Sequence, residues 1–229
     1  MAYSSLGARF YAADETGAVH VFDEAGSVVR RPLALSRGTG PLRVTPDGRW
    51  LFAINTALGR VHVIDTATGE PAFDIPVEGR PFQVVFTDAY AHIRTLDSNV
   101  VSMINLGELG KSAMPVVNRY EVGASGPGSV RDLPLATGIA RAANDAAVFV
   151  ASPADASVYF YMEGMNATAG SFQGYGHGPR AVEVINRSIR ETAPGVYTAS
   201  ARVPVSGTFS VALMTDAPRI VECFDVEVD

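Results

Sequence analysis

An all-β fold, made of a partial β-propeller with about four blade repeats and a C-terminal immunoglobulin-like β-sandwich, is predicted by three observations. A pattern of hydrophobic strand, short polar turn and second strand occurs four times, at the repeat length that is typical of propeller blades. The 229 residues include 22 glycines and 14 prolines and only 18% are charged, which suits short strands joined by tight turns. The repeat stops after residue 162, where a glycine-rich segment begins. We therefore assign residues 1–162 to the propeller and 163–229 to the sandwich.

The repeat length follows from equivalent valines in the first three repeats. Val19, Val61 and Val101 begin the second strand of each repeat, and the nearly equal intervals between them match the length of a propeller blade. The predicted blades lie near residues 8–35, 38–78, 79–122 and 137–162. Four blades of this length are not expected to close a ring alone. We therefore expect a second copy, or another chain, to complete the propeller.

Turn-forming residues stand where the strands end. Pro46-Asp47-Gly48 combines a residue that presets φ, a residue that caps its own backbone and a residue that accepts a positive φ. Acidic or amide residues follow the second strand of the first three repeats, namely Asp23, Asp65 and Asn105. Their side chains are expected to accept hydrogen bonds from turn N–H groups, which is a structural role.

The third and fourth repeats are further apart than the others. The interval from Val101 to Val158 is clearly longer than the two before it, and the excess falls in residues 107–135. Such an insertion is either a long hairpin of the outer strand or a functional loop, and the plain excursion is the favoured interpretation.

The segment PDGRWLFAINTALGRVHVIDTATGEPAFDIPVEGRP resembles the repeat of YVTN-type β-propellers, including the haem-d-type nitrite reductase propeller group. The resemblance covers residues 8–162 and is strongest in the second repeat; the chain departs from the family in its smaller number of blades. The resemblance implies a channel that can hold a porphyrin with histidine ligands. The blades offer three histidines for this role: His20, His62 and His92.

After residue 163, a glycine-rich loop leads into short predicted strands at residues 181–186, 196–203, 209–214 and 220–228, which suggest a sandwich. PGVYTASARVPVSGTFSVAL resembles the closing strands of small immunoglobulin-like bacterial domains of the YtkA/FixH type, and YMEGMNATAGSF resembles their methionine-rich entry segment. This resemblance covers residues 157–229 and so overlaps the fourth repeat. We prefer to assign residues 137–162 to a blade, because residues 137–152 align with residues 40–55.

The candidate metal ligands are soft or imidazole side chains in the C-terminal part of the chain: Met162, Met165, His177, Met214 and Cys223. Thioether, imidazole and thiolate groups select copper. No His or Met follows Cys223 closely, as a blue-copper site would require, so core filling is the favoured alternative. No cofactor is predicted outright; copper is the ion that this set would select, and haem is the weaker candidate that the propeller resemblance suggests.

The histidines of the first two repeats occupy equivalent places. His20 and His62 could converge on a shared ligand, but a polar-tipped side chain at a repeated strand position explains them more simply. His92 sits elsewhere in its repeat and breaks any ring of three histidines.

Several classes of protein are excluded by composition. The net charge of −6 argues against a nucleic-acid partner, and no window is long and apolar enough to span a membrane. The N-terminus shows no signal peptide, and its abrupt start is expected of a fragment of a longer protein. No nucleophile elbow, P-loop or zinc-protease motif occurs.

The sequence therefore predicts a non-catalytic binding and assembly module of an exported redox- or metal-handling complex. A periplasmic or extracellular location is implied by the family resemblance alone. The alternative is a haem- or copper-binding electron-transfer or oxidoreductase subunit.

Overall fold

The computed structural model describes residues 1–111, 114–129, 136–143, 146–185, 189–199, 205–216 and 219–228. The chain divides into two units, Met1–Val184 and Ile185–Asp229, and each is described by itself. The boundary predicted from the sequence lies earlier, after residue 162. The observed division is later because a fourth strand, β16 (Gly170–Gln173), joins the last blade before the first unit ends.

Four antiparallel sheets of four strands make up the first unit, one for each predicted repeat. The first blade holds β1 (Ala2–Ser4), β2 (Arg9–Ala13), β3 (Ala18–Phe22) and β4 (Leu33–Ala34). The second holds β5 (Thr39–Val44), β6 (Trp50–Asn55), β7 (Arg60–Asp65) and β8 (Glu70–Pro76). The third holds β9 (Pro81–Phe86), β10 (Tyr90–Thr95), β11 (Val100–Asn105) and β12 (Val117–Glu121). The fourth holds β13 (Ile139–Arg141), β14 (Ala147–Ser152), β15 (Ser157–Met162) and β16.

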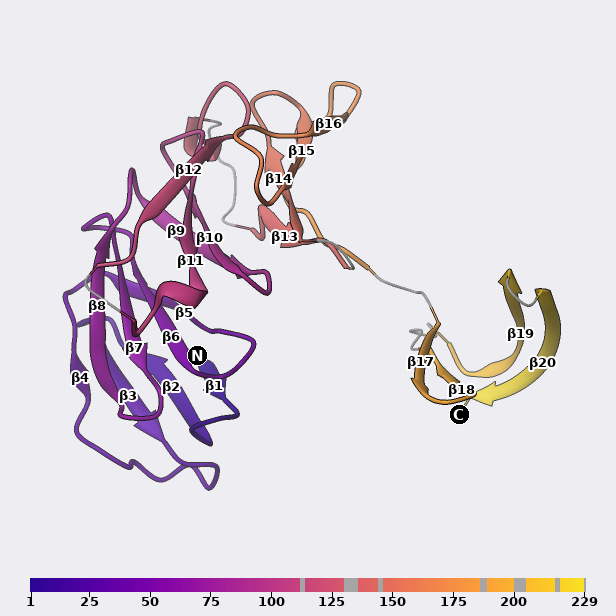
Figure 1. Ribbon diagram of the computed structural model, residues 1–229, viewed down its shortest axis with the longest axis horizontal. Helices are drawn as coiled ribbons and strands as arrows, with labels where there is room; N and C mark the ends of the chain where they lie inside the picture. The colour runs from indigo at the N-terminus through magenta and orange to yellow at the C-terminus, as the bar shows by residue number, and fades with distance from the viewer. Residues whose placement is uncertain are drawn as a thin grey trace. The chain divides into compact units, whose positions relative to one another are not determined.

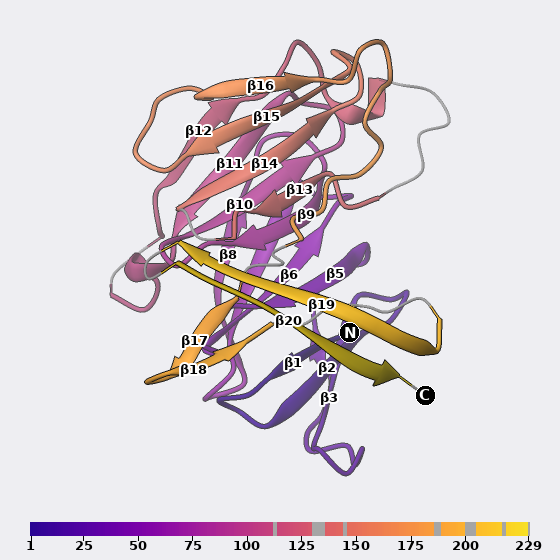
Figure 2. The ribbon, with the colours of Figure 1, turned by 90° about the vertical axis from the view of Figure 1, so that its right-hand side faces the viewer.

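The blades follow one another in chain order around an arc. Within the first unit, Figure 2 shows the indigo first sheet at the bottom and the orange fourth sheet at the top. The first strand of each blade contacts the first strand of the next, through the pairs β1–β5, β5–β9 and β9–β13. Every blade is a simple meander outward from that strand (Figure 1). The all-β fold and the partial propeller predicted from the sequence are therefore confirmed.

Three hydrophobic clusters occupy the three boundaries between consecutive blades. The first packs Tyr11 and Val19 of the first blade against Leu51 and Ala53 of the second. The same alternation continues along the arc, because side chains at successive strand positions face opposite neighbours. The second cluster includes Phe52, Ile54, Ala91 and Ile93, and the third includes Val101, Tyr120, Val148 and Tyr161.

The predicted turn chemistry is confirmed. The Asp23 carboxylate accepts hydrogen bonds from the N–H groups of Ala25 (3.0 Å) and Ser27 (2.8 Å). Asp65 and Asn105 accept equivalent bonds from the residue two positions ahead, at 2.9 and 2.8 Å. Each side chain thereby satisfies turn donors that the strands leave free.

Two strands lie outside the predicted blades. β16 follows the predicted end of the fourth blade, and β1 precedes the predicted start of the first, where three residues pair with β2 in register Tyr3↔Phe10. β12, the outer strand of the third blade, lies within the predicted blade at 79–122 and within the insertion at 107–135, and a loop with the 3-10 turn η2 (Pro127–Ser129) follows it. Another 3-10 turn, η1 (Leu106–Glu108), precedes β12.

The second unit consists of two hairpins in its described residues. β17 (Arg190–Ala193) pairs with β18 (Val196–Thr198), and β19 (Gly207–Asp216) pairs with β20 (Arg219–Val228). The predicted strand at 181–186 is wrong for its described part, 181–185, which carries no strand. The immunoglobulin-like sandwich stays a prediction. In the described ranges, no helix is long and apolar enough to cross a membrane.

Candidate functional site

The boundary between the third and fourth blades differs from the other two in its chemistry. The register places His92 and Arg94 of β10 at the positions that Phe52 and Ile54 hold in β6. In the second blade these positions are apolar and pack on the third blade. The third blade instead presents an imidazole and a guanidinium group, both fully buried, to the fourth.

His92 lies at the centre of a buried polar network. Its Nδ1 is 3.2 Å from the Tyr120 hydroxyl, and its Nε2 is 3.3 Å from Oε1 of Glu163. The Thr87 hydroxyl also donates to this Glu163 oxygen. Burial raises the pKa of Glu163, but the hydrogen bonds from His92 and Thr87, together with the electrostatic effects of His92 and Arg141, outweigh it, and the net effect lowers this pKa. The network therefore holds Glu163 in its charged form.

Two tyrosines complete the network. Tyr161 donates its hydroxyl hydrogen to the Met165 carbonyl oxygen at 2.9 Å, and its ring stacks on Tyr120. Burial raises the pKa of Tyr120 well above its usual value and also raises the pKa of Tyr161, so both phenols stay protonated. Each polar group of His92 and Glu163 named here has a partner inside the protein. The network is suited to fixing the two blades against each other.

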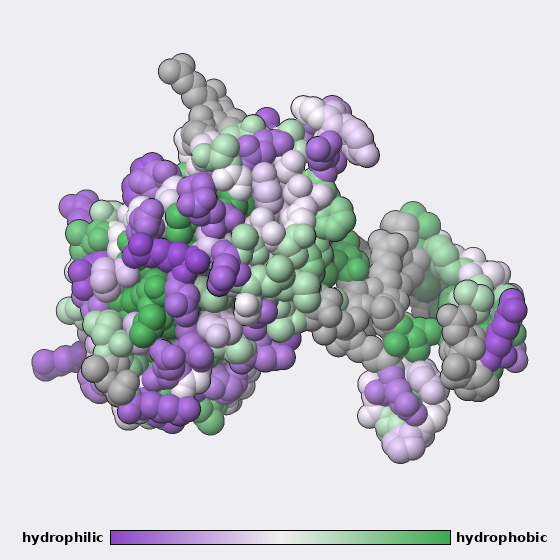
Figure 3. All heavy atoms as spheres, turned by 45° about the horizontal axis from the view of Figure 1, so that its top comes forward, coloured by the Kyte–Doolittle hydropathy of each residue, from purple (hydrophilic) through white to green (hydrophobic). Residues whose placement is uncertain are grey.

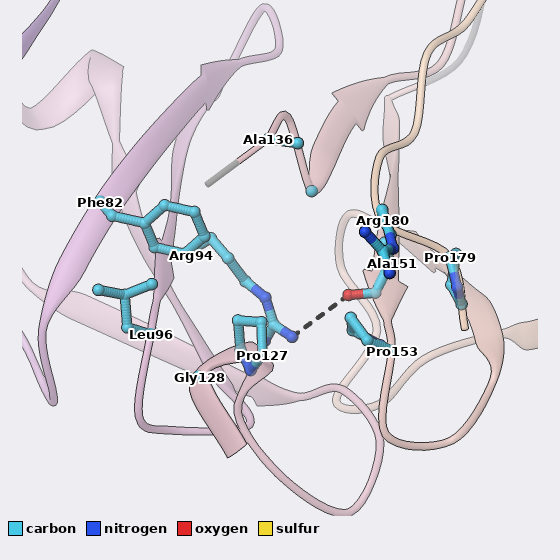
Figure 4. A pocket seen from close by; sticks show the side chains of 11 residues that line it. Phe82, Arg94, Leu96, Pro127, Gly128, Ala136, Ala151, Pro153, Pro179 and Arg180 are labelled. Atoms are coloured by element: carbon cyan, nitrogen blue, oxygen red, sulfur yellow. Dashed lines mark hydrogen bonds between the residues drawn. The ribbon is translucent and has the colours of Figure 1, made fainter. Parts of the chain in front are cut away.

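A pocket lies beside this network, at the end of β10 (Figure 4). Its volume is about 40 Å³ and it is lined by Arg94, Phe82, Leu96, the loop residues Pro127 and Gly128, and residues of the fourth blade and its exit segment. Figure 4 shows the Arg94 guanidinium group extending between Phe82 on one side and Pro153, Pro179 and Arg180 on the other. The insertion after β12 thus contributes a wall of this pocket.

Of the five predicted metal ligands, the three in the first unit lie at the two ends of β15. Met162 ends β15 and Met165 follows in the next turn, where its N–H donates to the Met162 carbonyl oxygen at 3.3 Å. His177 is in the loop after β16, whose end pairs with the beginning of β15, so it lies at the opposite end of that strand. β15 has six residues, which span about 17 Å.

Met214 and Cys223 belong to the second unit. Met214 pairs with Val221 and Cys223 pairs with Ala212, so the two sulfur atoms share one face of the β19–β20 hairpin as diagonal neighbours. Cys223 is exposed. Across the described ranges, no group of three or more His, Cys, Asp or Glu side chains could hold a metal ion. The metal site stays a prediction, because that statement does not test methionine ligands.

His20 and His62 are at equivalent positions, but the exposed fractions of their side chains differ. Nε2 of His20 is 2.8 Å from Asp14, and Nδ1 of His62 is 3.3 Å from Asp74, so each has a carboxylate of its own repeat. The first blade covers the His62 side chain, which is 9% exposed. His20 is 35% exposed, because its face of the first blade has no neighbouring blade in the described residues.

The outer face of the first blade is apolar and aromatic. Tyr3, Phe10 and Phe22 lie on it in register, and the rings of Tyr3 and Phe10 have centroids 4.7 Å apart. Tyr3 is 42% exposed. At the equivalent positions of the second blade, Leu51 and Ile64 are fully buried.

The outer face of the fourth blade has the same character. Phe149 and Phe160 pair directly across β14 and β15, with ring centroids 5.0 Å apart. Phe172 of β16, which is 61% exposed, lies 6.0 Å from Phe149. Phe52 and Val63, the equivalents of Phe149 and Phe160, are fully buried. Figure 3 shows hydrophobic residues, in green, at the surface of the first unit among hydrophilic residues in purple.

Sequence reasoning missed Arg94 and the loop that faces it. The signal was present in the alignment of the repeats, where Arg94 is a charged residue at a position that holds Ile54 in the second repeat. Burial could be inferred from that position, but the cavity could not, because it depends on Pro127, Gly128, Ala136 and Gly138, which are far from Arg94 in the sequence.

No protein-family model matches the chain, and no curated protein matches its sequence. Its structure is similar to that of Kuenenia stuttgartiensis hydrazine synthase, with a TM-score of 0.59 and 14% identity, covering 100% of this chain and 65% of that chain. It is also similar to the dihydro-haem d1 dehydrogenase NirN in complex with DHE, with a TM-score of 0.54, 14% identity and 73% and 35% coverage. A chain of the mitotic checkpoint complex matches with a TM-score of 0.58, 13% identity and 77% and 51% coverage.

These structures are β-propeller proteins, and at such low identity the likeness shows the fold alone. The chain spans less than two thirds of the length of each of them. The comparisons and the geometry agree that the first unit is a β-propeller module.

Proposed function

We propose that the chain is a non-catalytic binding and assembly module that completes a propeller ring with another copy of itself or with another chain. The observation that carries this proposal is the pair of uncovered aromatic faces on the first and fourth blades. Phe10 and Phe22 on one, and Phe149, Phe160 and Phe172 on the other, occupy positions that are buried wherever two blades meet, and Tyr3 lies beside Phe10. Exposed apolar faces of this kind mark interaction sites.

A second copy is the partner that the repeat favours. The outer face of the fourth blade carries the residues that each earlier blade turns toward its successor. The outer face of the first blade carries the residues that each later blade turns toward its predecessor. The fourth blade of one copy can therefore pack on the first blade of the next as consecutive blades do here. Two such contacts would close a ring of eight blades around a two-fold axis.

The test is the absolute mass of the purified chain, measured by light scattering over a range of concentrations. We expect twice the 24.2 kDa of one chain for the wild type. Phe160→Asp on the fourth blade and Phe10→Asp on the first should each return the mass to that of a monomer, because each places a charge in the apolar contact. Val211→Asp, at an exposed site of the second unit, is the matched control and should keep the larger mass.

A monomer at every concentration, with no change in solubility or stability on F160D and F10D substitution, would contradict the proposal. A monomeric wild type whose solubility rises with either substitution would show that the faces are adhesive and that another chain is the partner.

The wider setting of this module is also part of the proposal. Similarity to structures of hydrazine synthase and of NirN supports a place in a redox- or metal-handling complex, and the YVTN-type repeat supports an exported location. The diagonal pair Met214 and Cys223 supports the copper-binding alternative. Metal analysis of the chain after incubation with Cu(I), compared with a Cys223→Ser variant, tests that alternative.

A further inference from the structure

Arg94 carries a buried positive charge that the described part of the protein does not balance. The side chain is fully buried, and neither Nε nor Nη1 has a hydrogen-bond partner. Nη2 makes only a long contact of 3.4 Å to the Ala151 carbonyl oxygen. Nε and Nη1 together carry three of the five guanidinium N–H donors. A buried charge without partners is costly, so its retention calls for a function.

The charge remains at neutral pH. Burial lowers the pKa of Arg94 to about 10, and the chief opposing effect comes from the Tyr120 hydroxyl. None of the described residues that line the pocket is an aspartate or a glutamate. Arg180, on the far wall, adds a second guanidinium group, for which the described residues supply neither a carboxylate nor a hydrogen bond.

Two backbone N–H groups of the described pocket walls already have partners. The Gly128 N–H donates to the Leu96 carbonyl oxygen at 2.6 Å, and the Gly138 N–H donates to Gln83 at 2.8 Å. The prolines of the lining have no N–H group, and Phe82 and Leu96 add apolar surface. Among the described side chains of the lining, the free donors are therefore those of the two arginines. A cavity of about 40 Å³ holds only a few atoms, because one water needs about 10–15 Å³.

We propose that this pocket binds the carboxylate group of a small organic acid between Arg94 and Arg180, with its short apolar tail against Phe82 and Leu96. A guanidinium group matches a carboxylate with parallel N–H···O bonds, and such charge-assisted bonds are the strong ones. The apolar walls with a few convergent donors are typical of small-molecule sites. The site lies within one chain, so it does not depend on ring closure.

Acetate is the probe for the test. Titration calorimetry at pH 7 and constant ionic strength should give saturable binding of sodium acetate to the whole chain, and sodium chloride should give none. Arg94→Ile should abolish binding, and this variant is expected to fold because Ile54 holds the same position in the second blade. Arg94→Lys should weaken binding at least tenfold, since an ammonium group lacks the planar fork. Arg180→Gln should weaken it about threefold, because that arginine is exposed to solvent.

Arg37→Gln removes an exposed arginine outside the pocket and serves as the control that should bind acetate as the wild type does. Equal responses to acetate and chloride in the wild type, or unchanged acetate binding by R94I, would overturn the proposal.

A further variant tests whether the chain supplies its own carboxylate. Asp132 lies outside the described residues, and D132N should leave acetate binding unchanged. Acetate binding that appears only in D132N would show that the arginines serve an internal ion pair, and the site would then have no external ligand.

Discussion

The rings of Tyr120 and Tyr161 lie parallel across the boundary between the third and fourth blades, with centroids 3.6 Å apart and 4° between their planes. Tyr120 comes from the outer strand β12 and Tyr161 from β15, so the stack ties the insertion-bearing blade to the last one. Both rings also flank His92, at 5.9 and 6.0 Å. The stack thus lies at the same blade boundary that buries Arg94.

Tyr161→Ala should lower the free energy of unfolding by about 3 kcal/mol, because it empties a buried ring site between two blades. Tyr161→Phe should cost about 1 kcal/mol, since it keeps the stack and loses the hydrogen bond to the Met165 carbonyl. Urea unfolding followed by fluorescence measures both. Tyr197→Ala, at an exposed site of the second unit, is the control and should change stability little. Equal effects of Y161A and Y197A would show that the stack does not hold the blades together.

Arg94→Ile should raise the free energy of unfolding by about 1–2 kcal/mol in buffer without carboxylates, because it removes a buried charge that no described carboxylate balances. Thermal melts of this variant and the wild type, in chloride buffer, measure the difference. A loss of stability larger than about 1 kcal/mol would mean that the guanidinium group has a stabilising partner within the folded chain.

Stability should fall as the pH drops from 7 toward 5, and His62 should account for part of the loss. Burial lowers the pKa of His62 below 6.5, although Asp74 opposes the shift. A histidine with a depressed pKa stays neutral in the folded protein while the unfolded chain takes up a proton below pH 6.5, so protonation favours unfolding. His62→Leu should therefore flatten the dependence of unfolding free energy on pH in this window. His177→Leu, in an exposed loop, is the control for loss of one histidine. An unchanged slope in H62L would refute this assignment.

Asn55→Ala should cost about 2–3 kcal/mol. The side chain is fully buried, and its amide donates to the carbonyl oxygens of Ser36 and Arg37, both at 3.1 Å. Its oxygen accepts from the Leu58 N–H at 3.0 Å, so one residue joins the entry loop of the second blade to the turn after β6. Thermal unfolding measures the loss, with Asn166→Ala as an exposed control. A cost below that of N166A would show that water replaces these bonds.

The fold was predictable because its determinants are local and repeated. The alternation around Val61 and the turn at Pro46-Asp47-Gly48 specify a hairpin without knowledge of distant residues, and the period of the valines then orders the blades. β1 and β16 were harder to predict. Each is the terminal strand of its sheet, and Gly170–Gln173 is short and wholly exposed, so it lacks the apolar alternation that marks the inner strands.

The pocket could not be predicted in the same way. The position of Arg94 in the repeat predicts that its side chain is buried. The residues that surround it could not be predicted, because they are far apart in the sequence. Pro127 lies in the insertion, Ala151 belongs to the end of β14 and Arg180 follows β16. The backbone at Gly128 lies so close to Leu96 that a Cβ at Gly128 would come within 2.7 Å of the Leu96 carbonyl oxygen. Sequence spacing carries no record of such a contact.

The uneven number of neighbours along the arc has a consequence for local unfolding. The second and third blades are each held on both faces, whereas the first and fourth are held on one face only within the described part of the chain. In stacked repeats, stability is approximately a sum of each repeat's own stability and its interface terms. Amide hydrogens of β2 and β15 should therefore exchange with solvent before those of β6 and β10. When a partner packs on the outer face of the first or fourth blade, that blade gains the second interface that the middle blades already have. Assembly should therefore be detected first as slower amide hydrogen exchange in the first and fourth blades.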